Sequence, residues 1–109
     1  MVTRKNPRKK VGSIDDIQRI LREHIAELSE KYGIKSLELF GSYVRGEQKR
    51  GSDIDILVEF GKGQSPTLFS FVALEQELTD LLGGKVDLVE KRTLKPVLRN
   101  RILQEAVPI

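Results

Sequence analysis

Apolar residues recur about every three or four positions in the first part of the chain, and this spacing predicts an amphipathic helix. The positions that form the apolar stripe are Ile14, Ile17, Leu21, Ile25 and Leu28. Ser13 precedes the stripe and has the side chain of a helix N-cap, while Gly33 follows it and is typical of a helix C-terminus. We therefore expect a helix that begins near residue 13 and ends near residue 32.

Short apolar and β-branched runs predict three strands, which alternate with further helices. The strands are expected over residues 35–40, over 56–58 with the residues that lead into it, and over 85–90. A helix with a wide apolar stripe, expected in a core or an interface, covers about 67–82, and a last helix opens at Lys95-Pro96 and stops before Pro108. This order predicts an α+β (α/β) fold: a small mixed β-sheet with helices mainly on one face.

Length and composition fit one small globular domain. The chain has 109 residues, of which 39% are hydrophobic, and these suffice for a modest core. It has no cysteine, which excludes disulfides, zinc–thiolate sites and thiol nucleophiles. No apolar run approaches the ~20 residues of a membrane span, so we expect no membrane partner and a cytoplasmic location. Composition leaves open whether the protein forms homo- or hetero-oligomers.

Much of the net charge of +3 comes from the N-terminus. Residues 1–12 include five basic side chains, namely Arg4, Lys5, Arg8, Lys9 and Lys10. No aromatic residue lies among them, so we interpret residues 1–12 as a flexible, solvated basic arm and do not expect nucleic acid as a partner. The folded domain is then expected over residues 13–109.

Two acidic residues, Asp53 and Asp55, lie on the second predicted strand. Side chains on a strand alternate between faces, so these two carboxylates point to one side, while Ile54 and Ile56 point to the other. Carboxylates side by side repel each other unless a positive charge lies between them. Because hard oxygen ligands suit Mg²⁺, the pattern predicts a divalent cation at this position.

The pair Gly41-Ser42 ends the strand that precedes these acids. Glycine lets a backbone approach a ligand closely, and if Ser42 caps a short helix over residues 43–47, its free N–H groups would bind a phosphate. Taken alone, a Gly-Ser pair is usually a turn, and an Asp-x-Asp pair is usually a solvated strand face. Together, at this spacing and between two strands, they are much more specific.

The segment Gly41-Ser42, then ten residues, then Asp53-Ile54-Asp55 resembles the signature of the DNA-polymerase-β-like nucleotidyltransferase superfamily. The longer pattern G-S-x-x-R-G…G-S-D-I-D-I-L-V resembles its minimal branch, the minimal nucleotidyltransferase (MNT) domains. These are often partners of HEPN proteins in toxin–antitoxin pairs. The resemblance covers nearly the whole chain from about Ser13 and implies a polymerase-β-like nucleotidyltransferase fold.

The resemblance also implies an activity and its residues. It implies nucleotidyl transfer from ATP with two Mg²⁺ ions, and it makes Asp53, Asp55 and Asp87 the catalytic carboxylates and metal ligands. Without the resemblance, an isolated strand residue such as Asp87 would be interpreted as structural or exposed. The residues it implies for nucleotide binding are Gly41, Ser42 and Arg45, the last of which falls on the arginine of G-S-x-x-R-G.

In MNT–HEPN pairs the MNT protein transfers AMP to a tyrosine of the HEPN ribonuclease and silences it. The resemblance therefore implies an antitoxin with a HEPN-type toxin as its partner. Larger superfamily members add a helical acceptor-binding domain, for which we see no room here, so we expect the acceptor to be a protein or to be held by a separate partner. Two alternatives stay open: a non-catalytic binding antitoxin or interaction module, and a catalytic subunit that modifies a small molecule or a nucleic acid.

Overall fold

A computed structural model describes residues 12–109, so nearly all of the expected basic arm over residues 1–12 lies outside the described residues. Four strands form one sheet in the order β3-β2-β1-β4. Their bounds are β1 Ile34–Phe40, β2 Ile54–Phe60, β3 Val86–Glu90 and β4 Val107–Pro108. Strand β1 pairs antiparallel with β2 and β4, whereas β2 pairs parallel with β3. The sheet is therefore mixed, as the sequence predicts.

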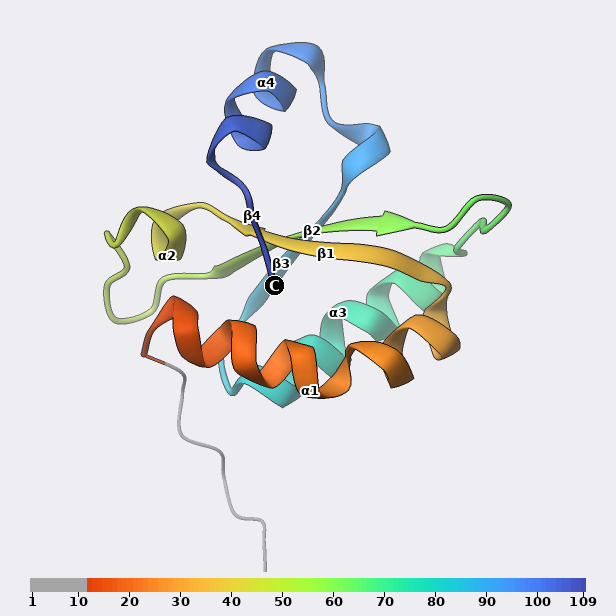
Figure 1. Cartoon of the computed structure of the whole chain (residues 1–109), viewed down its shortest axis with the longest axis horizontal. Helices are drawn as coiled ribbons and strands as arrows, with labels where there is room; N and C mark the ends of the chain where they lie inside the picture. The colour runs from red at the N-terminus through yellow and green to blue at the C-terminus, as the bar shows by residue number, and fades with distance from the viewer. Residues whose placement is uncertain (1–11) are drawn as a thin grey trace, which may run out of the picture.

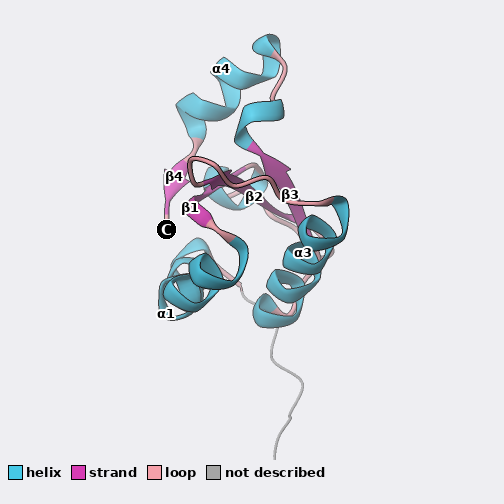
Figure 2. Ribbon diagram, turned by 90° about the vertical axis from the view of Figure 1, so that its right-hand side faces the viewer, coloured by secondary structure: helices cyan, strands magenta, loops and turns pink. Residues whose placement is uncertain are grey.

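The helices lie unequally on the two sides of the sheet. Their bounds are α1 Ile14–Tyr32, α2 Ser42–Arg45, α3 Leu68–Leu82, α4 Pro96–Glu105 and the short 3₁₀ helix η1 Lys91–Thr93. Figures 1 and 2 show α1 and α3 together on one side of the sheet and α4 on the other. The α+β class with helices mainly on one face is confirmed. Strand β4 and helix η1 were not predicted, because two or three residues are too few to show a periodic pattern.

Local signals set the helix ends. The Ser13 side chain accepts a hydrogen bond from the Asp16 N–H (3.3 Å), and Gly33 ends α1 in the left-handed region with φ 73°. Thr67 caps α3 in the same way, accepting from the Ser70 N–H at 3.0 Å. Such caps satisfy backbone groups that have no partner within the helix. The predicted bounds of both long helices are therefore confirmed to within a residue.

The core lies between the sheet and the α1–α3 layer. The helices contribute six side chains with no solvent exposure: Ile17, Leu21, Leu28, Leu74, Leu78 and Leu82. The sheet contributes the alternate residues of its strands, including Leu37, Leu39, Ile54, Ile56, Val58, Val86 and Leu88. Burying each such side chain stabilises the fold by roughly 1.5–3 kcal/mol before entropy losses. This face of the sheet supplies most of the driving force for folding.

Side chains of α3 cover the free edge of β3. The Val86 N–H donates to Thr79 Oγ1 (3.1 Å), and the Leu88 N–H donates to Glu75 Oε2 (3.0 Å). Unpaired N–H groups at a sheet edge otherwise invite pairing with another chain. These two bonds also fix β3 along the helix, and so they fix the position of Asp87 between the two bonded residues.

Some apolar side chains remain in solvent. At the start of α3, Leu68 is 75% exposed, Phe69 86% and Val72 52%, so the predicted apolar stripe is buried only in its C-terminal part. In α4, Val97 is 86% exposed and Leu98 47%, and no residue of this helix is buried. Within residues 12–109, no helix has the length and apolar character needed to cross a membrane.

Candidate active site

The three predicted carboxylates lie on neighbouring strands. Asp55 is the direct partner of Asp87 in the parallel β2–β3 register, and directly paired residues of a sheet point to the same face. Asp53 immediately precedes β2, two residues before Asp55. Ile54 and Val86, next to these acids, are buried in the core on the opposite face. The structure thus places Asp55 and Asp87 on the face opposite Ile54 and Val86, and the parallel pairing brings Asp87 to Asp55.

Asp55 is the most perturbed member of this group. Burial raises the pKa of its carboxyl from 3.8 to about 6, and the negative charges of Asp87 and Asp53 add to the effect. The positive charge of Arg45 acts in the opposite direction but does not outweigh them. A partly buried carboxylate beside two others is stabilised by a proton or by a cation.

The donor set fits Mg²⁺, because it consists of carboxylate oxygens, which are the ligands that this hard cation prefers. Within the described part of the chain, however, no three Asp, Glu, His or Cys side chains are close enough to hold one metal ion as they stand. Asp55 is partly buried and Asp87 is exposed. The assignment of Asp53, Asp55 and Asp87 as ligands of two ions stays a prediction.

Gly41 brings the predicted phosphate turn against these carboxylates. It directly follows Phe40, which pairs with Asp55 across β1 and β2. Gly41 has φ 83°, a value that residues with a side chain rarely adopt, and a Cβ atom here would overlap the Asp55 carboxylate. The close approach of turn and acid therefore requires glycine.

The expectation that Ser42 caps the short helix is wrong. Gly41 is the N-cap of α2, no side chain makes a capping bond, and Ser42 is the first helical residue. The reason is that Gly41, with its positive φ, already places its carbonyl to accept from the N–H groups of Val44 (3.1 Å) and Arg45 (3.2 Å). The helix also ends earlier than residue 47, because Gly46 terminates it in the left-handed region with φ 70°.

Arg45 lies beside the turn and contacts a residue that the sequence did not single out. Its Nη1 donates to Glu105 Oε1 (2.9 Å), and its Nε donates to Glu47 Oε1 (2.9 Å). The other oxygen of Glu105 accepts from the Gly41 N–H at 2.6 Å. Burial acts to raise the pKa of the Glu105 carboxyl, but the bonds from Gly41 and Arg45 outweigh it, so that pKa is lowered. No local pattern marks Glu105, because it lies 64 positions from Gly41.

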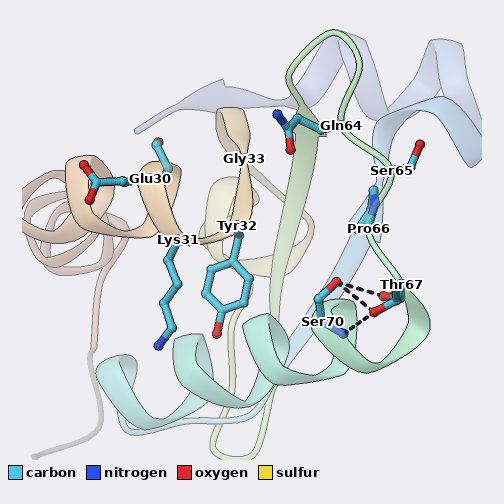
Figure 3. Close-up of a pocket in the computed structure, with 10 residues that line it drawn as sticks. Glu30, Lys31, Tyr32, Gly33, Gln64, Ser65, Pro66, Thr67 and Ser70 are labelled. Carbon is cyan, nitrogen blue, oxygen red and sulfur yellow. Dashed lines mark hydrogen bonds between the residues drawn. The ribbon is translucent and has the colours of Figure 1, made fainter.

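A hollow of about 390 Å³ lies elsewhere, between the C-terminus of α1 and the N-terminus of α3. Figure 3 shows Tyr32 and Lys31 pointing toward α3 and Ser70 bonded to Thr67 at the start of that helix. Its lining includes none of the six predicted site residues. We therefore build the functional argument on the carboxylates and the glycine turn.

A glycine turn beside paired strand carboxylates, on a small mixed sheet, is the arrangement that the sequence resemblance predicts for a nucleotidyltransferase domain. The model of the nucleotidyltransferase domain family matches residues 21–109. Because this match spans most of the chain, the protein belongs to the nucleotidyltransferase domain family. The resemblance to the minimal, polymerase-β-like branch is confirmed, and the protein is an enzyme of the nucleotidyltransferase type.

Relatives and solved structures agree with this placement. The protein adenylyltransferase MntA of Thermococcus cleftensis is 45% identical over 95 residues, which cover 87% of this chain and 94% of that protein. The structure of a candidate minimal nucleotidyltransferase superposes with a TM-score of 0.73 at 38% identity and covers 90% of this chain and 97% of that one. An MNT antitoxin in complex with the tri-AMPylated HEPN toxin of Shewanella oneidensis gives a TM-score of 0.60 at 26% identity, covering 84% of this chain and 70% of that one.

Proposed function

We propose that this protein transfers AMP from ATP to a tyrosine hydroxyl of a HEPN-type toxin and so acts as an antitoxin in the cytoplasm. The observation that carries the proposal is the pairing of Asp55 with Asp87 directly beside the Gly41 turn. The similarity to a protein adenylyltransferase, and to an antitoxin in complex with an AMPylated toxin, supports this choice among the reactions open to the family.

Each part of the site has a role in this reaction. The N–H groups at Gly41 and Ser42, with the guanidinium of Arg45, bind the β- and γ-phosphates, so that pyrophosphate leaves from a fixed position. Asp53, Asp55 and Asp87 would hold the two Mg²⁺ ions through their carboxylate oxygens. The bound ions supply neutralisation of the charge that develops on the attacking and leaving oxygens.

The chemical step is a single displacement at phosphorus. The tyrosine oxygen forms a bond to the α-phosphorus, and the bond from that phosphorus to the bridging oxygen of the pyrophosphate breaks. Asp87 accepts the proton of the hydroxyl, since it is the carboxylate of the three that is most open to solvent. The products are the AMP-tyrosine ester and pyrophosphate.

The position of Asp87 favours a large acceptor. It lies on β3, which is an edge strand of the sheet, and its side chain is exposed. Within residues 12–109 the sheet and its helices form a single unit, and no second set of elements surrounds this edge. A tyrosine on the surface of another protein can reach this exposed carboxylate, whereas a small acceptor would have few contacts there.

The test is incubation of the full chain with ATP, Mg²⁺ and a HEPN-type toxin, followed by mass spectrometry of that toxin. We expect a mass gain of one or more AMP groups, and no gain with Asp53→Asn or Asp55→Asn. A toxin that is silenced without any mass gain, and equally by both variants, would show that binding alone neutralises it. AMP found on an added nucleic acid or small molecule would instead support the catalytic-subunit alternative.

A further inference from the structure

The side chain of Glu105 occupies the donors that the proposed function assigns to the nucleotide. One carboxylate oxygen accepts from the Gly41 N–H (2.6 Å), and the other accepts from Arg45 Nη1 (2.9 Å). Glu105 comes from the last turn of α4, far along the chain from the glycine turn. A single anionic group thus bridges the backbone and the side chain of the phosphate turn.

A carboxylate and a phosphate satisfy these donors in the same way. Both are anions that accept charge-assisted hydrogen bonds from a guanidinium and from a backbone N–H. The Gly41 N–H can donate one strong hydrogen bond, so it cannot serve Glu105 and a phosphate oxygen together. The negative charge of Glu105 would also repel a triphosphate placed beside it. In addition, the two anions would compete for hydrogen bonds from the Arg45 guanidinium.

Helix α4 has few contacts that hold it against the sheet. None of its residues is buried, and Val97 and Leu98 point into solvent. Its N-cap, Lys95, makes no side-chain capping bond, and Arg99 reaches the Lys91 carbonyl only at 3.3 Å. A helix without buried apolar contacts opens at low free energy relative to the core.

We propose that Glu105 is an internal competitor for the nucleotide: it closes the phosphate turn in the free protein, and ATP binds by displacing it. The proposal rests on the proposed function, because it takes Gly41 and Arg45 as triphosphate ligands. Displacement of Glu105 breaks the contact of α4 with the glycine turn, so nucleotide binding and the position of this helix are coupled.

Helix α4 lies on the side of the sheet away from α1 and α3 (Figures 1 and 2). Asp55 and Asp87 face the same side, because their neighbours Ile54 and Val86 are buried in the core on the opposite face. The change in α4 therefore takes place on the face that carries the carboxylates.

The first test compares nucleotide affinity in the wild-type protein and in Glu105→Gln. The nonhydrolysable analogue AMP-PNP is titrated with Mg²⁺ in a calorimeter, so that chemistry does not interfere. Glutamine keeps the shape and a neutral acceptor but removes the charge, so we expect about tenfold tighter binding, the factor that corresponds to ~1.4 kcal/mol. Glu47→Gln is the matched control, because it removes the other carboxylate on Arg45 without touching Gly41, and we expect less than about a twofold change.

The second test is amide hydrogen exchange with and without AMP-PNP in the wild-type protein. We expect faster exchange over residues 96–105 when the analogue binds, because α4 loses its bond to Gly41. Glu105→Asp, which keeps the charge on a shorter side chain, should fall between wild type and Glu105→Gln in affinity. Thermal melts of each variant confirm that the fold is retained.

The outcomes separate the two proposals. Equal or weaker binding by folded Glu105→Gln, with wild-type binding intact, overturns the role of Glu105 as a competitor and leaves the proposed function standing. Slower exchange over residues 96–105 on binding does the same. Absence of AMP-PNP binding in the wild type and in all variants overturns the proposed function and the competitor role together.

Discussion

The two faces of the sheet are built in different ways. The face toward α1 and α3 is aliphatic, and the helix residues that contact it, such as Leu21 and Leu78, have no solvent exposure. The face toward α4 carries Asp55 and Asp87, and α4 contributes no buried residue. The comparison teaches that the aliphatic face supplies the stability of the fold. The other face can therefore carry neighbouring carboxylates, although their mutual repulsion lowers stability.

Charge on the α4 face is balanced only in part. Lys91 Nζ lies 3.4 Å from Glu38 Oε1 and 3.6 Å from Glu59 Oε1, away from the three aspartates. Leu57 lies between the core residues Ile56 and Val58 in β2 and points to the α4 face, where its side chain is only 1% exposed. Burial raises the pKa of Asp55, and the negative charges of Asp87 and Asp53, which no cation balances fully, add to the effect.

The largest expected effect is a loss of AMP transfer in a variant that keeps its fold. Asp55→Asn removes a proposed metal ligand from the α4 face, so AMP transfer should fall by at least ~10³-fold. The melting temperature should not fall, because the change removes a buried charge and no core contact. Quantitative mass spectrometry of the acceptor and a thermal melt of the variant measure both effects. Transfer within tenfold of wild type would show that Asp55 does not act in the reaction.

The next effect is on stability without a direct effect on chemistry. Leu78→Ala, on the aliphatic face, should lower the free energy of unfolding by about 2–5 kcal/mol, since it leaves a cavity in a fully buried site. Leu98→Ala is the matched control on α4, where the same change at 47% exposure should stay within about 0.5 kcal/mol. Urea denaturation measures both. Equal losses at the two positions would contradict the division of roles between the faces.

Gly41→Ala should lower both the stability of the fold and the affinity for nucleotide, and its effect on stability should be smaller than that of Leu78→Ala. The new Cβ meets the Asp55 carboxylate and the backbone has φ 83°, so the free energy of unfolding should fall by about 1–3 kcal/mol. Nucleotide binding should weaken in parallel because the turn must shift. Gly46→Ala is a useful control: its φ is 70°, but a Cβ there has open space around it. If both variants behave alike, the backbone conformation and not the contact with Asp55 decides the effect.

The smallest effect is the pH dependence that Asp55 creates. Its folded pKa is raised from 3.8 to about 6, so its contribution to stability is full below 3.8 and is lost as the pH rises through about 6. Above pH 6, Asp55→Asn should therefore exceed the wild type in free energy of unfolding, by on the order of 1 kcal/mol after solvent screening. Denaturation at a series of pH values without Mg²⁺ measures the difference. A gap that does not change across this range would contradict the shift.

Sequence patterns predicted the parts of the fold that local rules control. The apolar stripe from Ile14 to Leu28 and the caps at Ser13 and Gly33 are sufficient to place α1, because each acts within a few residues. The same-face geometry of Asp53 and Asp55 follows from strand alternation alone. The pairing of Asp87 with Asp55 does not, because a parallel register between distant strands leaves no periodic signal, and only the family resemblance pointed to it.

The remaining features depend on long-range contacts or on backbone dihedral angles. Ser42 has a capping side chain, but the positive φ of Gly41 moves the cap one residue earlier, and no residue type in the segment decides between the two. The contact of Glu105 with Gly41 arises only once α4 folds over the sheet. The catalytic and nucleotide-binding roles of Asp53, Asp55, Asp87, Gly41, Ser42 and Arg45 stay predictions. The variants above test those of Asp53, Asp55 and Gly41.

The parallel pairing of β2 with β3 has a consequence for the order in which the protein folds. Strands β1 and β2 are antiparallel neighbours, so they can pair as soon as the segment between them closes. Strand β3 is parallel to β2 and can pair with it only after the connection that contains α3 has crossed the sheet. Closing that longer loop is the slower event. We therefore expect Asp87 of β3 to join the other two carboxylates last, so that a partly folded chain would not contain the assembled candidate site.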